Sequence, residues 1–218
     1  MTPAIAYPYG SPDRPLVVCD VDEVVLEFVQ PFRDFLASHE FELVTDSFKL
    51  TGNIRPHGGG GPLDGPATKL LLSDFFAEQE RWQRPAIGAA EALAMLAQAC
   101  DLVFLSAMPP QHAAVRRRHL DALGLHAFPL IADESPKGVI VQALRGAASR
   151  PAAFIDDLPH NHAAVMRDAP GVACIHLMAN ADFRALMPPL PEGIAIARDW
   201  PHCTSLVQSA FAHSPHQD

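Results

Sequence analysis

The sequence predicts an α/β protein with a doubly wound, Rossmann-like parallel sheet core and a small helical cap insertion. Short runs rich in Val, Ile, Leu and Phe recur along the chain and are too short for helices, so they indicate strands buried on both faces. Helical patterns separate these runs, and this alternation is typical of a parallel sheet with helices on both sides. One long stretch after the first run breaks the alternation and indicates the insertion.

The apolar runs place the strands. The first predicted strand is Leu16 to Cys19. The later strands are predicted at Leu102 to Leu105, Phe128 to Ile131, Ala153 to Ile155 and Val172 to Ile175, followed by an edge strand at Ile194 to Ala197.

Turn and cap residues place the helices between these strands. Gly124 is a natural end for a helix over Gln111 to Leu123. Ser135 and Pro136 predict the N-cap and the first position of the next helix, which runs to Gly146. The remaining helices are predicted at Gly88 to Ala99, at Pro159 to Ala169, and from Pro201 onward.

The stretch between the first strand and the helix at Gly88 contains no convincing core strand. It combines a helical pattern with an aromatic face at Val25 to Glu40, a Gly- and Pro-rich loop at 52–66, and a second helical pattern at Lys69 to Arg81. We therefore expect residues 26–85 to form a helical cap, and residues 1–25 and 86–218 to form the core domain.

Composition and charge limit the kinds of ligand and partner that the protein is expected to bind. The net charge is -9, and the densest basic run is Arg116 to Arg118, so a nucleic acid polymer is not an expected ligand. A small anion held by local positive groups and a metal remains compatible with this charge. No apolar run is long enough to span a membrane and no signal-peptide pattern opens the chain, so we expect a cytoplasmic protein without a membrane partner. The four cysteines form no Cys-x-x-Cys pair and are expected to be buried free thiols.

Two carboxylates interrupt the apolar segment VVCDVDEVV, residues 17–25. Asp20 and Asp22 would be costly to bury at a strand end unless a cation pairs with them. Magnesium is the natural candidate because it prefers carboxylate oxygens. The alternative is a polar turn that leads from the strand into a loop.

Three later segments also place polar groups at strand ends, where open α/β sheets bind ligands. Ser106 ends an apolar strand and could donate to a phosphate oxygen, although a turn serine is the simpler interpretation. Lys137 falls in the first turn of a predicted helix, where a bound anion would favour it, although it could be an ordinary solvated lysine. Asp156 and Asp157 follow a strand side by side, and since both cannot be helix caps, one is expected to bind metal.

The joint order Asp-x-Asp, Ser, Lys, Asp-Asp resembles the haloacid dehalogenase-like (HAD) hydrolase superfamily, in its phosphatase type with a cap inserted after the first motif. The resemblance covers residues 16–176 and implies a Mg²⁺-dependent phosphohydrolase. It implies that Asp20 is the nucleophile that forms an aspartyl-phosphate. It also implies that Asp22 is the general acid and base and offers its backbone carbonyl to the metal.

The resemblance assigns the remaining residues as well. It implies that Ser106 and Lys137 hold the phosphoryl oxygens, and that Asp20 with Asp156 or Asp157 holds Mg²⁺. Here Asp156 occupies a place where the family often has glycine, which favours Asp157 as the direct ligand without excluding the reverse. Asn161 falls where the family often has a polar residue, so it is a candidate for substrate binding or for orienting Asp157 or Lys137.

The implied substrate is a small phosphate monoester, with a nucleotide or a sugar phosphate as examples, and the protein is expected to be a monomer or a homodimer. A phosphotransferase that uses the same intermediate and a catalytically idle binding protein are the alternatives.

The HGGG segment at 57–60 has no accompanying Gly-x-Ser-x-Gly or P-loop lysine, which argues against a lipase and an NTPase. A receiver domain would order its acidic motifs differently. His160 and His162 are expected to be solvated surface residues rather than substrate contacts.

Overall fold

The computed structural model describes residues 7–146 and 150–212. In this part of the chain, six strands form a parallel sheet in the order β5-β4-β1-β6-β7-β8, which confirms the predicted α/β fold. The strands are β1 (Leu16–Cys19), β4 (Asp101–Ser106), β5 (Leu130–Ala132), β6 (Ala152–Asp156), β7 (Ala173–His176) and β8 (Ala195–Ile196).

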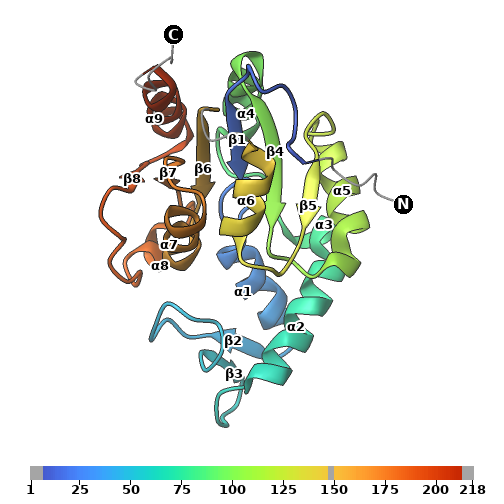
Figure 1. The fold of residues 1–218 in the computed structure, drawn as a ribbon. Helices are drawn as coiled ribbons and strands as arrows, with labels where there is room; N and C mark the ends of the chain where they lie inside the picture. Colours follow the sequence, from blue (N-terminus) through green and yellow to red (C-terminus); the bar gives the residue numbers. More distant parts are fainter. Residues whose placement is uncertain (1–6, 147–149, 213–218) are drawn as a thin grey trace.

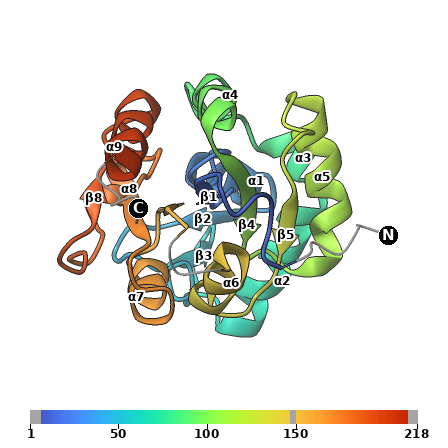
Figure 2. The ribbon, with the colours of Figure 1, turned by 45° about the horizontal axis from the view of Figure 1, so that its top comes forward.

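Helices cover both faces of this sheet, as Figure 2 shows. On one face lie α4 (Ala89–Ala99), α5 (Ala113–Ala122) and α9 (Trp200–Ala212), and on the other lie α6 (Lys137–Arg145) and α7 (Pro159–Asp168). Strand β1 shows why both faces are apolar. Val17 and Cys19 pack into the core of the first face, while Leu16 and Val18 pack into the core of the second, because successive side chains of a strand point to opposite sides.

The segment 26–85 lies at the end of the sheet toward which the strand arrows point (Figure 1). It contains α1 (Val29–Ser38), β2 (Phe41–Leu43), β3 (Ile54–Pro56), α2 (Gly65–Ala77) and α3 (Gln79–Trp82). The segment contains the expected helices, and it also contains a strand pair that the sequence did not predict, because β2 and β3 pair antiparallel. Each of these strands has three residues, too few for the sequence to show a strand period.

The segment 26–85 has an aromatic core of its own. Phe32, Phe35 and Phe75 are fully buried there. The ring of Phe75 meets those of Phe32 and Phe35 edge-on, at centroid distances of 5.2 and 5.5 Å. These are favourable aromatic geometries, and they join α1 to α2.

Two predicted helix starts are corrected. Helix α1 begins at Val29 rather than at Val25, because the chain first makes a turn that includes Glu23 at φ 62°. Helix α6 begins at Lys137, with Pro136 rather than Ser135 at the N-cap position. The backbone N–H of Ser135 instead donates to Asp133 Oδ1 at 2.7 Å, closing a local turn.

The short elements α8 (Ala181–Arg184) and the 3-10 helix Pro110–His112 complete the described structure. All four cysteines are buried and free, as expected. A search of the helices in the described ranges finds none with the length and apolar character needed to cross a bilayer.

Gly138 lies where α6 packs against α7, and no side chain is expected to fit at this position. A Cβ at this position would overlap the backbone oxygen of Ala164 and would lie 2.5 Å from Asp168 Oδ2. Gly138→Ala is therefore expected to lower the free energy of unfolding by about 1–3 kcal/mol, as overpacking does. Urea denaturation measures the change.

The control is Gly65→Ala in α2, where an added Cβ would meet no atom within 4 Å apart from its chain neighbours. This substitution is expected to change stability by no more than about 1 kcal/mol, because the helix preference of alanine is opposed by the restriction that Pro66 places on the residue before it. Equal effects of the two substitutions would show that the contact between α6 and α7 is not close-packed at Gly138.

Candidate active site

Three buried carboxylates meet where two neighbouring strands end. Asp20 follows β1, Asp156 is the last residue of β6, and Asp157 comes next. The backbone N–H of Asp20 donates to the carbonyl of Ile155 at 2.9 Å, which continues the pairing of the two strands. The ligand atoms of Asp20, Asp156 and Asp157 lie within 4.8 Å of one another. Strand register thus brings together residues that are far apart in the sequence.

Lys137 supplies the positive charge of this cluster. Its ammonium Nζ lies 2.8 Å from Asp20 Oδ2 and 2.7 Å from Asp156 Oδ2. Its side chain is only 1% exposed, so water does not screen these ion pairs. The prediction that Lys137 lies in the first turn of a helix is confirmed, because it is the first residue of α6.

Asp156 is held from several sides. Besides Lys137, it accepts hydrogen bonds from the backbone N–H of Leu158 at 2.8 Å and from Asn161 Nδ2 at 3.0 and 3.1 Å. Burial acts to raise the pKa of Asp156, but the charge of Lys137 and these hydrogen bonds outweigh it and keep the pKa below its usual value. Asp156 is therefore a fixed, ionised carboxylate.

Asp20 and Asp157 have raised pKa values, in contrast to Asp156. Burial raises the pKa of Asp20 to about 7, and the charges of Asp156 and Asp22 add to this effect while Lys137 only partly offsets it. Burial also raises the pKa of Asp157 well above its usual value, with further contributions from the charges of Asp156 and Asp20. The cluster thus contains more negative charge than Lys137 neutralises. A hard divalent cation with oxygen ligands fits this donor set.

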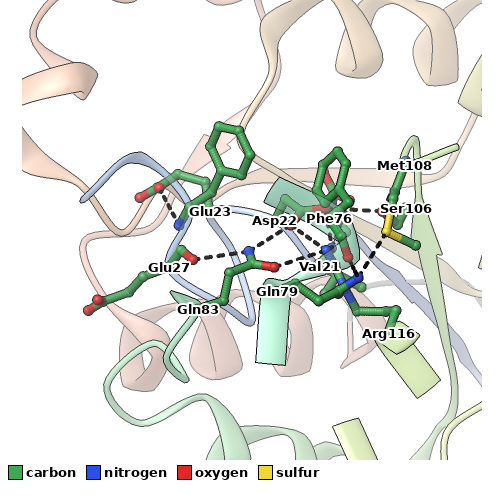
Figure 3. A network of polar contacts seen from close by, with 12 residues as sticks. Val21, Asp22, Glu23, Glu27, Phe76, Gln79, Gln83, Ser106, Met108 and Arg116 are labelled. Carbon is green, nitrogen blue, oxygen red and sulfur yellow. Dashed lines mark hydrogen bonds and ion pairs between the residues drawn. The ribbon is translucent and has the colours of Figure 1, made fainter. Parts of the chain in front are cut away.

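Asp22 belongs to a separate polar network, shown in Figure 3. The guanidinium of Arg116 donates to both of its oxygens, at 2.8 Å to Oδ1 and 3.1 Å to Oδ2. Gln83 Nε2 donates to Oδ1 at 2.9 Å, and Ser106 Oγ donates to Oδ2 at 3.2 Å. Although burial acts to raise the pKa of Asp22, the charge of Arg116 and the hydrogen bonds lower it overall. Four donor contacts thus fix this carboxylate in its ionised form.

Arg116 was not predicted as a site residue. It lies on α5, is 0% exposed, and also contacts Gln79 and Gln83, which lie in and directly after α3. In the sequence it belongs to a basic run and resembles its solvated neighbours. The one available signal was its spacing of four residues from Leu120, which places it on the buried face of the same helix.

The predicted site residues therefore fall into two groups. Asp20, Asp156, Asp157, Lys137 and Asn161 surround the acidic cluster, while Asp22 and Ser106 lie in the Arg116 network. The predicted phosphate contacts of Ser106 and Lys137, the predicted substrate contact of Asn161 and the metal contact of the Asp22 carbonyl stay predictions.

The two histidines near the second acidic motif differ from each other. His160 is exposed, as predicted. His162 is 0% exposed, so its predicted surface position is wrong. Its Nε2 lies 3.0 Å from the backbone oxygen of Asp156, and this contact draws the ring under the strand end.

Glu23 also has a structural role that the sequence did not reveal. Its carboxylate accepts the backbone N–H groups of Phe28 at 3.0 Å and Val29 at 2.7 Å, at the start of α1. The backbone N–H of Asn180 donates to its other oxygen. Glu23 thus joins the segment 26–85 to the loop after β7 and leaves the acidic cluster to the three aspartates.

Comparison with known proteins identifies the fold. No protein-family model and no curated protein matches the chain. Solved structures do match it across most of their length. A haloacid dehalogenase-like hydrolase from Streptococcus pneumoniae is similar with a TM-score of 0.58 and 14% identity, over 88% of this chain and 97% of the other.

Two further structures agree with this match. A candidate phosphoglycolate phosphatase from Lactobacillus plantarum gives a TM-score of 0.57 at 13% identity, over 88% of this chain and 99% of the other. A HAD family hydrolase from Deinococcus radiodurans, with bound phosphate and sodium, gives 0.54 at 15% identity, over 94% of this chain and 100% of the other. Together with the parallel sheet and its order, these matches show that the chain has the haloacid dehalogenase-like fold.

Proposed function

We propose that this protein is a magnesium-dependent phosphohydrolase that cleaves small phosphate monoesters through an aspartyl-phosphate on Asp20. The observation that carries the proposal is the cluster at the ends of β1 and β6, where Asp20 lies 2.8 Å from Lys137 and within ligand distance of Asp156 and Asp157. A dianionic phosphate can approach such carboxylates only if positive charge offsets them. The phosphate bound to the Deinococcus radiodurans hydrolase supports the same class of ligand.

The residues present fit a magnesium ion. Asp20 and Asp157 would hold it with their carboxylates, together with the backbone carbonyl of Asp22, while Asp156 keeps Lys137 and Asn161 in place. When bound, magnesium supplies positive charge that offsets the phosphoryl oxygens. We favour Asp157 over Asp156 as the direct ligand, because Asp156 is already satisfied by donors.

The chain's own residues account for the two chemical steps. Asp20 Oδ attacks phosphorus, the bond to the leaving oxygen breaks, and water later releases phosphate from Asp20. Lys137 and Ser106 would hold the phosphoryl oxygens in both steps. Asp22 would give a proton to the leaving oxygen and later take one from the attacking water. Asp22 is ionised while Arg116, Gln83 and Ser106 donate to it, so its carboxylate must leave Arg116 and take up a proton from solvent before the first of these transfers.

The direct test is an assay of phosphate release from a panel of phosphate esters, with Mg²⁺ and with a chelator. Activity that needs Mg²⁺ is the expected result. Transfer of the phosphoryl group to an alcohol without phosphate release would favour a phosphotransferase. Magnesium binding without any turnover would favour an idle binding protein.

Magnesium is also expected to stabilise the fold through Asp157. A ligand that binds only the native state adds about 2.7 kcal/mol of stability at a concentration 100 times its Kd. Thermal unfolding with and without Mg²⁺ should therefore show a higher Tm with Mg²⁺ for the wild type and a much smaller shift for Asp157→Asn. The control is Asp182→Asn, which removes an exposed carboxylate on α8 and should keep the full shift. Equal shifts in the wild type and Asp157→Asn would exclude Asp157 as the ligand.

A further inference from the structure

A large cavity opens above the acidic cluster. Its volume is about 1180 Å³, and Asp20, Asp22 and Asp157 are among the residues that line it. This volume slightly exceeds the range of about 300–1,000 Å³ that is usual for small-molecule sites, so there is room for an organic group besides a phosphate. The segment 26–85 contributes much of the wall, and the segments that follow β1, β4, β5, β6 and β7 contribute the rest.

The wall of this cavity is mainly apolar. Its large side chains come from different elements and include Phe28, Phe48, Leu70, Phe76, Met108 and Phe183. Leu70 is 69% exposed although it lines the cavity, so an apolar surface is left uncovered there. Figure 3 shows Phe76 and Met108 close to the Asp22 network, which places apolar groups next to the proposed reaction site.

The polar lining residues outside the proposed site do not offset this apolar character. Lys49, Lys69, Gln111, Glu134 and His160 are exposed side chains, so like Leu70 they lie where the cavity meets water.

The more buried polar lining residues already have partners. Both oxygens of Glu23 accept backbone N–H groups, and Ser73 Oγ lies 3.0 Å from His112 Nε2. The interior of the cavity therefore offers few hydrogen-bond partners to the hydroxyl groups of a sugar, and burying such groups without partners is costly.

We infer that the substrate is a phosphate monoester whose organic group is apolar, such as a hydrocarbon ring, rather than a sugar phosphate. This inference rests on the proposed function, because it assumes that the phosphate lies at the acidic cluster. The apolar group would then occupy the space between Phe76, Met108 and Leu70 and would remove their surface from water. Charged groups at the rim would stay in contact with solvent.

A matched pair of esters tests the inference. Cyclohexylmethyl phosphate and glucose 6-phosphate share a six-membered ring that carries a CH₂–O–phosphate group, and they differ mainly in the hydroxyl groups. We expect kcat/KM to be at least about tenfold higher for cyclohexylmethyl phosphate, since one methylene alone can give that discrimination in an apolar pocket. Equal or better turnover of glucose 6-phosphate would overturn the inference while leaving the phosphohydrolase proposal intact.

A substitution in the wall of the cavity tests whether Leu70 contributes to binding of the apolar ester. Leu70→Ser is expected to raise KM for cyclohexylmethyl phosphate severalfold with a smaller change in kcat, which is the pattern of lost ground-state binding. The control is Met95→Ser on α4, which also removes an exposed apolar side chain, at 53% exposure, but lies outside the cavity. A KM that Leu70→Ser leaves at the wild-type value would overturn the assignment of this wall.

Binding separates the inference from the proposed function. The phosphonate analogues of the two esters can be titrated by calorimetry, and we expect tighter binding of the cyclohexyl compound. Preferential binding without turnover of any ester would overturn the phosphohydrolase proposal but keep the ligand class. Turnover with preferential binding of the sugar analogue would keep the phosphohydrolase proposal and overturn the apolar ligand class.

Discussion

Asp20→Asn is expected to lower phosphate release by at least about 10⁴-fold, because it removes the proposed nucleophile and the loss of such a group is not compensated by its neighbours. An amide oxygen attacks phosphorus poorly and cannot form the aspartyl-phosphate. Asp156 cannot replace Asp20, since it is held by Lys137 and Asn161. Phosphate release from the best ester of the panel measures the effect.

The loss should occur in a folded protein. Asp20 is buried and its pKa is raised to about 7, so a neutral amide of the same shape removes a costly charge from the interior. Lys137 keeps Asp156 as its partner at 2.7 Å. The free energy of unfolding of Asp20→Asn is therefore expected to stay within about 1 kcal/mol of the wild type. A fully active Asp20→Asn protein would exclude Asp20 as the nucleophile.

Local sequence patterns were sufficient to predict the core. The predicted strand Leu16 to Cys19 is the observed β1. Four apolar residues in a row are typical of a strand that is buried on both faces, and the aspartate that follows them marks its end. The ends of parallel strands lie at one edge of a sheet, so the prediction that Asp20 and Asp156 belong to one site followed from topology. The structure brings them together through the pairing of β1 with β6.

The features that sequence reasoning missed depend on contacts between distant segments. The burial of Arg116 requires α3 and α5 to pack together around Asp22, and within the run Arg116 to Arg118 only its spacing from Leu120 distinguishes the first arginine from the others. The pairing of β2 with β3 is likewise decided by tertiary contacts, since Leu43 and Ile54 become buried only against the aromatic core of the segment 26–85. His162 is hidden for the same reason, beneath β6.

Arg116→Met is expected to lower the free energy of unfolding by about 3 kcal/mol, at the lower end of the range for breaking a buried ion pair. Stability falls because the charge of the Asp22 carboxylate would remain without its partner. Arg116 is 0% exposed and donates to both oxygens of Asp22, whose side chain is 19% exposed, so little water can replace the guanidinium. Arg116 also donates to Gln83 Oε1 at 3.1 Å, and this amide would lose a partner too. Urea denaturation of wild type and variant measures the difference.

Two further variants decide whether this loss comes from the unpaired charge of Asp22. Arg118→Met lies two residues along α5 and removes an exposed pair with Glu80 and an exposed hydrogen bond to the carbonyl of Ala114 at 3.4 Å, so it should change stability by no more than about 0.5 kcal/mol. Asp22→Leu combined with Arg116→Met removes both charges and should recover much of the loss, because replacing a buried ion pair by apolar groups costs far less than breaking it. If the double variant is as unstable as the sum of the single variants, the packing of Arg116 rather than its charge stabilises this region. A double variant close to the wild type would instead show that Arg116 is retained at the site for its effect on Asp22, since the fold would then be stable without either charge.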